Sequence, residues 1–509
     1  MPPAEQLYAE NQLLLAENNE MKLELAKLRA QIEYYKRKLF GGGQSEKMDR
    51  AQMLMNLGEL EKAVQKAAEI ETITYSREKN ANDAQTRRER ERQAFEKLPV
   101  TETITIVPDE VKAAPEAYEK ISEERTVELD ITPPKLIKRE YIRPKYRRRA
   151  DRAQPPVVAP APARPVPGGY ASAGLIAYII ISKYLNHLPL RRLERMSAHW
   201  GMQIPEQNMA EWMRIAAEWL QPIYNKMRET LLQCAYLMAD ETPVKCNDPG
   251  GRNNGTTQTY LWVMSTPGGD AVFIHRPSRA HEHAAALLGE NYRGILQSDA
   301  YPCYQKYARE HPGVIPLGCL AHARRKFFEA QNENPKLTRV ILKLIGRLYR
   351  HEREWNEQNV GHDHVRAWLR TRHYARTLRW LKTIALDKRD KVLPQSQTGK
   401  AITYLLNQWD SLAAHANHGH TRLDTNLIEN DIRPSAVGKR NWLFIGHPEA
   451  GQRTAILYSI VISCRRHGVD PLAYLRDVLS RLPAMSNQDD LTPLLPANWQ
   501  PTASGKTAA

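Results

Sequence analysis

Two aspartates each close a short apolar run that has the composition of a β-strand. Residues 234–239 precede Asp240, and residues 294–298 precede Asp299. Paired carboxylates repel each other unless a cation neutralises them, so such pairs commonly hold Mg²⁺. Two metal ions about 4 Å apart activate a water or sugar hydroxyl and stabilise the leaving oxygen. An aspartate that closes a strand is more often a turn residue, but two of them in a basic protein favour metal-dependent phosphodiester chemistry.

A third acidic residue, Glu429, lies in a segment with helical spacing. Asn426, Glu429 and Arg433 stand at positions i, i+3 and i+7, so they share one face of a helix. That face offers a carboxylate for a metal ion, with an amide and a guanidinium for phosphate oxygens. Spacing alone favours a salt-bridged surface helix equally well. Asp431 should point away from this face.

The order of elements around the aspartates predicts where they lie. Runs rich in β-formers at 259–265 and 271–275 are separated by Pro-Gly-Gly, which predicts a hairpin. A helical segment at 280–288 precedes the run that ends at Asp299. Three strands, a helix and a strand form the order of a ribonuclease H-like α/β core, a mixed sheet whose first and fourth strands are neighbours. Asp240 and Asp299 are therefore expected side by side at adjacent strand ends.

The charge balance favours a polyanionic partner. Lys and Arg number 73 against 58 Asp and Glu, a net charge of +15, which favours nucleic acid or an anionic membrane surface. The longest uncharged apolar run, 173–182, is too short to span a bilayer. Because the N-terminus is polar and acidic, we expect no signal peptide. The five cysteines are never paired as C-x-x-C, which indicates a reducing cytoplasm.

The first forty residues carry a heptad repeat. One seam position is occupied in turn by Leu7, Leu14, Met21, Leu28 and Tyr35. This repeat predicts a coiled coil over 1–40 that joins the chain into a homodimer or higher oligomer. A single amphipathic helix docked on its own domain is the alternative. Residues 41–130 form a charged, helical connector in this interpretation.

A basic segment and a Pro-rich segment follow the connector. Nine basic residues lie between 135 and 152, within a basic arm at 131–152. At this density cations neutralise phosphates and release counterions. Because the Pro-rich linker at 153–169 adjoins it, we expect an extended arm lying on DNA rather than a solvated charge run.

Three helical segments come next, at 175–185, 190–199 and 206–220. Two short helices about a Gly-containing turn fit a helix-turn-helix over 170–225, in which the second helix enters the major groove. Many small helical domains share this pattern, so it is weak by itself.

The ordered series of motifs resembles transposases of the insertion-sequence-66 family. The matching stretches are residues 35–40 (YKRKLF) with 45–47 (SEK), 143–146 (RPKY), 188–191 (LPLR), 238–242 (MADET), 297–301 (QSDAY), 319–327 (CLAHARRKF), 426–434 (NLIENDIRP), 439–444 (KRNWLF) and 470–475 (DPLAYL). They cover nearly the whole chain in order.

The resemblance implies transposition by a DDE site on a ribonuclease H-like fold, in a bacterial, nucleoid-associated protein. Its triad corresponds to Asp240, Asp299 and Glu429, which would hold two Mg²⁺ ions, or Mn²⁺. The core would span 226–435 with a helical insertion at about 330–420. The implied partners are the terminal repeats of the element, target DNA and accessory proteins of the same element.

One departure concerns zinc. The family typically carries a C-x-x-C segment just after the position of Tyr146, where this chain has Arg147-Arg-Arg, and no cysteine precedes Cys234. Zinc is therefore not expected, and the basic arm is expected to supply DNA affinity. The expected DNA contacts are Lys145, Arg147, Arg148, Arg149, Arg324, Arg325, Arg433, Lys439 and Arg440. The secondary site candidates are His322 and Asn426.

The remaining chain is expected to form a helical region at 436–483 and a disordered tail at 484–509, because the tail is polar and contains proline. Two other functions compete with transposition. A non-catalytic DNA-binding regulator needs no acidic triad, and a structure-specific nuclease on the same fold would cut DNA without joining it.

Overall fold

The computed structural model describes residues 134–146, 157–248, 255–486 and 488–501, with scattered positions between 89 and 127. The expected coiled coil, most of the connector, and Arg147, Arg148 and Arg149 lie outside the described residues. The chain forms two units, residues 1–129 and 130–509. In the first unit, the described part contains helix α3 (Asp109–Ala113) and the 3-10 turn η1 (Pro115–Ala117). The features below belong to the second unit.

A five-stranded mixed sheet has the strand order β5-β4-β3-β6-β7. Its strands are β3 (Tyr236–Asp248), β4 (Gly255–Ser265), β5 (Ala271–Arg276), β6 (Gly294–Gln297) and β7 (Val314–Leu317). Strand β4 is antiparallel to both of its neighbours, β3 and β5. Strand β6 is parallel to β3, and β7 is parallel to β6. The expected neighbours, the first and fourth strands, are thus paired. The predicted hairpin turn contains Gly268 at φ +75°, a conformation that favours glycine.

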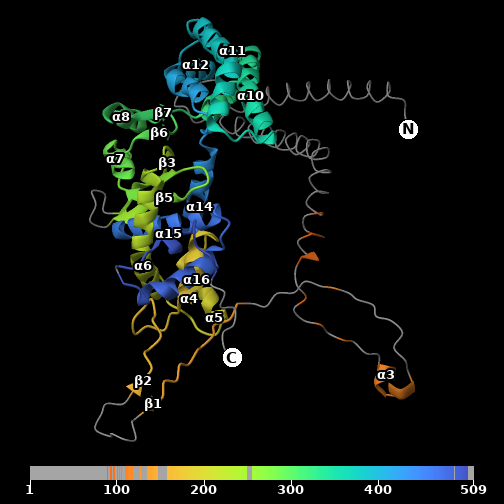
Figure 1. The fold of residues 1–509 in the computed structure, drawn as a ribbon, viewed down its shortest axis with the longest axis vertical. Coiled ribbons are helices and arrows are strands. Elements are labelled where there is room, and N and C mark those ends of the chain that lie inside the picture. Colours follow the sequence, from red (N-terminus) through yellow and green to blue (C-terminus); the bar gives the residue numbers. More distant parts are fainter. Residues whose placement is uncertain are drawn as a thin grey trace, which may run out of the picture. The chain divides into compact units, whose positions relative to one another are not determined.

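Helix α15 (Pro448–Arg466), buried along its central stretch from Thr454 to Cys464, covers edge strand β5 (Figure 1). The side chains of Ser463 and Ser459 accept hydrogen bonds from the N–H groups of Ala271 and Phe273, at 3.0 and 2.8 Å. These bonds satisfy edge donors that would otherwise be buried without partners. The helix therefore closes one edge of the sheet.

The three helices expected before the sheet are α4 (Ala173–Tyr184), α5 (Leu190–His199) and α6 (Glu206–Leu232). Helix α6 extends twelve residues beyond the predicted end at 220, through Pro222. It continues because Ile223, Tyr224 and Met227 are buried in the core of the sheet. The Tyr224 hydroxyl donates to the carbonyl oxygen of Phe273 on β5 at 2.9 Å.

A second apolar core lies among helices that follow β7. They are α9 (Leu320–Glu329), α10 (Pro335–Glu357), α11 (Asp363–Arg389), α12 (Gln397–Asn407) and α13 (Trp409–Ala413). This region matches the helical pattern expected across the proposed insertion. Buried Arg370 on α11 pairs with Glu352 on α10 at 2.7 Å and donates to the carbonyl oxygen of Thr421 at 2.6 Å. The guanidinium thus joins two helices to the chain segment that returns toward the sheet.

The remaining described elements are β1 (Lys145–Tyr146), β2 (Val157–Val158), α7 (Glu282–Leu288), α8 (Pro302–Glu310), η2 (Ala414–Asn417), α14 (Asn426–Trp442), α16 (Pro471–Arg481), η3 (Leu482–Ala484) and η4 (Thr492–Leu494). None of the described helices is long and apolar enough to cross a membrane.

The prediction of a disordered tail from residue 484 was wrong for the described residues up to 501. Leu494 is fully buried, and its carbonyl oxygen accepts a hydrogen bond from the Tyr474 hydroxyl on α16 at 2.6 Å. The Trp499 indole donates to the carboxylate of Asp477 on the same helix at 2.8 Å. A few apolar anchors are enough to hold this polar segment against α16.

Candidate active site

The β3–β6 register places two aspartates at equivalent positions. The parallel pairing ends at Met238 opposite Gln297, and Asp240 and Asp299 each lie two residues further along. The expected proximity of the two residues agrees with this register. The expectation that Asp240 ends its strand was wrong, because β3 continues to Asp248 while paired with β4.

Asp240 interacts electrostatically with acidic residues from three parts of the chain. Burial and the negative charges of Glu241, Asp299 and Glu429 together raise the pKa of Asp240 to about 8. One carboxylate oxygen of Asp240 accepts a hydrogen bond from the backbone N–H of Glu241 at 2.8 Å, which opposes this rise. A buried carboxyl group whose pKa is raised by neighbouring carboxylates is typical of a site that binds a cation.

Glu429 lies in the first turn of α14. Its Oε1 atom is buried and has no hydrogen-bond partner among the described residues. His322 Nε2 lies 3.8 Å from this oxygen, and an Arg325 guanidinium nitrogen lies 3.6 Å from Oε2. Both distances are too long for a hydrogen bond. A buried carboxylate oxygen without a partner fits a place where a metal ion would bind.

Glu429 also belongs to a second group of possible metal ligands. Ligand atoms of Cys319, His322 and Glu429 lie within 4.8 Å of one another. Sulfur, nitrogen and oxygen donors of this kind are typical of Zn²⁺ sites, whereas three carboxylates suit Mg²⁺ or Mn²⁺. Burial raises the pKa of the Cys319 thiol, which disfavours the thiolate that zinc requires. The secondary candidate His322 is therefore next to the acidic site, while Asn426 is exposed at the start of α14.

Sequence reasoning missed a buried ion pair behind the two aspartates. Glu241 has a side chain that is 1% exposed and pairs with Arg279, whose Nε donates at 2.9 Å. The Tyr304 hydroxyl donates to the other Glu241 oxygen at 2.7 Å. The only signal in the sequence is that Glu241 follows Asp240 directly, and strand alternation places these two side chains on opposite faces of β3.

Arg279 also connects this pair to the second aspartate. Its guanidinium carbon lies 3.9 Å from the centroid of the Tyr301 ring, and its carbonyl oxygen accepts from the Tyr301 hydroxyl at 2.7 Å. The backbone N–H of Tyr301 donates to a carboxylate oxygen of Asp299 at 2.9 Å. Arg279 thus supports the turn that carries Asp299 while it neutralises Glu241.

The predicted DNA contacts fall into different environments. Arg324, Arg433 and Arg440 are exposed, whereas Arg325 is close to Glu429. Lys439 is not free, because its ammonium donates to the carbonyl oxygen of Pro243 on β3 at 2.7 Å. Burial and the neighbouring Arg440 lower the pKa of Lys439. As expected, Asp431 points elsewhere: it is buried and pairs with Arg466 of α15 at 2.6 Å.

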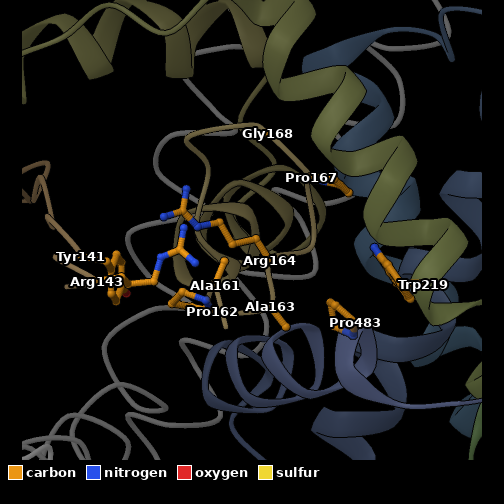
Figure 2. Close-up of a pocket in the computed structure, with 10 residues that line it drawn as sticks. All are labelled: Tyr141, Arg143, Ala161, Pro162, Ala163, Arg164, Pro167, Gly168, Trp219 and Pro483. Carbon is orange, nitrogen blue, oxygen red and sulfur yellow. The ribbon is translucent and has the colours of Figure 1, made fainter. Parts of the chain in front are cut away.

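The described part of the basic arm doubles back on the Pro-rich linker. Exposed Lys145 and Tyr146 pair with Val158 and Val157 in a two-stranded ladder. A cavity of about 570 Å³ lies beside this region (Figure 2). Its lining residues are Tyr141, Arg143, Ala161, Pro162, Ala163, Arg164, Pro167, Gly168, Trp219 and Pro483. No acidic residue lines it, so this cavity is separate from the carboxylate site.

Comparison with known proteins gives the family. A model described as "Transposase IS66 family" matches residues 168–453, the "IS66 C-terminal element" matches 459–497, and "Transposase C of IS166 homeodomain" matches 27–103. The chain belongs to the IS66 family of transposases. At the family level these are DNA-binding, DNA-cutting enzymes of the DDE type that use divalent metal ions.

Relatives with similar sequences occur in Sinorhizobium fredii. The uncharacterized protein y4jD is 31% identical over 511 residues, which cover 94% of this chain and 96% of the relative. The uncharacterized protein y4qI is 30% identical over 419 residues, covering 79% of this chain and 76% of the relative. These names assign no catalytic residues.

Proposed function

We propose that this chain is an insertion-sequence transposase that cuts element ends and joins their 3′-hydroxyl groups to target DNA, with Asp240, Asp299 and Glu429 as its acidic triad. The observation that carries the proposal is the parallel β3–β6 register, which sets Asp240 and Asp299 at equivalent positions of neighbouring strands. The charge of Glu429 on α14 also acts on Asp240 and helps to raise its pKa. The strand order supports a ribonuclease H-like core, with the first strand between the second and the fourth.

The three carboxylates would hold Mg²⁺ or Mn²⁺, because their donor atoms are all oxygens and the negative charges of Asp299 and Glu429 both act on buried Asp240. When bound, the metal would activate a nucleophilic oxygen and stabilise the leaving oxygen. Other residues of the chain position the carboxylates and offer cations to the DNA. Arg279 holds the turn of Asp299, and the exposed guanidiniums of Arg324 and Arg433 are available to phosphate oxygens.

DNA affinity in this proposal also comes from helices before the sheet. The outer face of α6 carries Glu211 and Glu218, both paired with Arg214, so it has little attraction for phosphate. On α5, Arg191, Arg192 and Arg195 are exposed. If these helices form a helix-turn-helix, α5 is the better candidate for the DNA backbone contact. In this proposal the chain dimerises through residues 1–40, acts together with accessory proteins of the same element and works in the cytoplasm.

The test is a cleavage and joining assay with labelled element ends, target DNA and Mg²⁺. Wild type should give nicked and joined products. Asp299→Asn and Glu429→Gln should each lower cleavage by a factor of about 10³ or more while DNA binding persists, because each removes a metal ligand and no DNA anchor. Asp248→Asn, further along β3, is the matched control and should cleave like wild type.

The products separate the alternatives. Nicked DNA without joined products would favour a structure-specific nuclease. DNA binding without cleavage in either Mg²⁺ or Mn²⁺ would favour a non-catalytic regulator. Cleavage at a near wild-type rate by Glu429→Gln would remove Glu429 from the triad.

A further inference from the structure

We propose that the exposed face of α10 is a second binding surface, which contacts the backbone of double-stranded DNA away from the carboxylate site. The α10 basic stripe consists of Lys336, Arg339, Lys343, Arg347 and Arg350. All five side chains are exposed. The inference rests on the proposed function for its DNA, but it concerns a different surface.

The spacing of the stripe puts its members on one face. Successive members are three or four residues apart, so their side chains lie along one line of the helix. The opposite face carries buried Leu337, Ile341 and Ile345, which pack in the second apolar core. From Lys336 to Arg350 the stripe spans 14 helical steps, about 21 Å of helix axis at 1.5 Å per residue.

The charges of the stripe are uncompensated. The segment from 336 to 351 contains no Asp or Glu. Within the described part of the chain, none of the five cations forms an ion pair, whereas Arg366 and Arg370 on neighbouring α11 both pair with Glu352. Like charges at i and i+4 destabilise a helix, so the stripe opposes folding unless a ligand of opposite charge covers it.

Duplex DNA fits this surface better than a compact anion. It presents about one negative charge per 1.7 Å along a rod, so it can meet cations spread over the whole length of the stripe. Lysine and arginine on a convex helix face contact phosphates without reading base edges. The same helical region also exposes Trp368, with Arg372 lying 5.6 Å from its ring centroid. We therefore expect a contact that holds DNA irrespective of its sequence.

The experiment measures binding of the full chain to two duplexes, one random and one containing an element end, in EDTA so that no cleavage occurs. The stripe variant is Lys343→Gln/Arg347→Gln/Arg350→Gln. The matched control is Lys388→Gln/Arg389→Gln/Lys391→Gln, which removes three cations that pair with Asp387 and Asp390. Both variants lose the same formal charge from the same group of helices.

The stripe variant should reduce the slope of log K against log salt by up to about 2.7, about 0.9 for each phosphate that the protein no longer neutralises. Its Kd should rise at least about tenfold at 0.1 M salt, equally for both duplexes. The control should change much less, because two carboxylates already offset most of the charge of its three cations. With saturating DNA and Mg²⁺, the stripe variant should cleave like wild type.

An unchanged salt slope in a stripe variant with the wild-type melting temperature would overturn the inference and leave an acidic protein as the partner of α10. Lost affinity for the element end alone would also contradict it, since the stripe would then read sequence. Slow cleavage at saturating DNA would show that the stripe is not separate from the carboxylate site. Failure of wild type to bind either duplex would refute the proposed function itself.

Discussion

Replacing Asp240 with Asn is expected to abolish strand cleavage and to raise the melting temperature of the metal-free protein. The cleavage loss follows from the removal of a ligand of the proposed metal site. The stability gain follows from the carboxyl group itself: burial and three nearby carboxylates raise its pKa to about 8 in the folded chain. An unfolded Asp has a pKa of about 3.9, so folding without metal disfavours the charged form.

Because the pKa of Asp240 is raised by folding, the stability of the metal-free protein should depend on pH. Between pH 4 and 8 the folded state binds more protons at Asp240 than the unfolded state does, so this residue lowers stability progressively as pH rises and no further above pH 8. Asn carries no charge and removes this effect. The gain in Tm for Asp240→Asn should therefore be small at pH 5 and largest at pH 8 to 9.

Thermal melts in EDTA at pH 5 and 8.5 check this expectation for wild type, Asp240→Asn and Asp248→Asn. The Asp248 variant should follow wild type at both pH values, because Asp248 is not among the charges that act on Asp240. A gain that is larger at pH 5, or an Asp240→Asn protein less stable than wild type at pH 8.5, would contradict the electrostatic description of the site.

Arg279→Ala is expected to cause the second large effect, on both stability and cleavage. It leaves the carboxylate of Glu241, 1% exposed, without its cation. Breaking a buried ion pair costs about 3–5 kcal/mol, and we expect the lower end, about 3 kcal/mol, because Arg279 is itself partly exposed. Cleavage should fall as well, since the turn of Asp299 loses the group that packs on Tyr301.

The double variant Glu241→Gln/Arg279→Ala separates the two effects. The neutral Gln needs no cation and can keep the hydrogen bond from Tyr304, so urea unfolding should show most of the stability restored. Cleavage should stay low, because Tyr301 still lacks its partner. If the double variant is no more stable than Arg279→Ala, the unpaired charge of Glu241 is not the cause of the loss.

The strand order around the two aspartates could be predicted from the sequence, because it depends on the order of strands and helices along the chain. Neighbouring first and fourth strands follow from the succession of strands and helix before Asp299. The length of β3 could not be predicted, since Pro243 and Lys245 resemble a turn, and residues 241–248 are extended because β4 pairs with them as far as Gly255. Long-range pairing overrides local preference there.

The surroundings of the acidic residues depend on tertiary packing that local patterns do not encode. The helical face of Glu429 was predictable, but its position beside Cys319 and His322 depends on long-range hydrogen bonds, in which Thr425 donates to the Cys319 sulfur and Leu320 donates to the carbonyl oxygen of Leu423. The pairing of Glu241 with Arg279 on the other face of β3 likewise has no local signal. The folded tail at 488–501 was missed because a few buried anchors outweigh its polar composition.

Mn²⁺ binding, measured by electron paramagnetic resonance on the full chain, shows whether Asp240, Asp299 and Glu429 form one metal site. Wild type should bind the ion, and Asp240→Asn, Asp299→Asn and Glu429→Gln should each bind it at least about tenfold more weakly, because each removes one oxygen ligand. Cys319→Ser and Asp248→Asn should bind like wild type. Binding that is lost in Cys319→Ser and kept in Asp240→Asn would place the ion in the Cys319–His322–Glu429 set and contradict a site made of the three carboxylates.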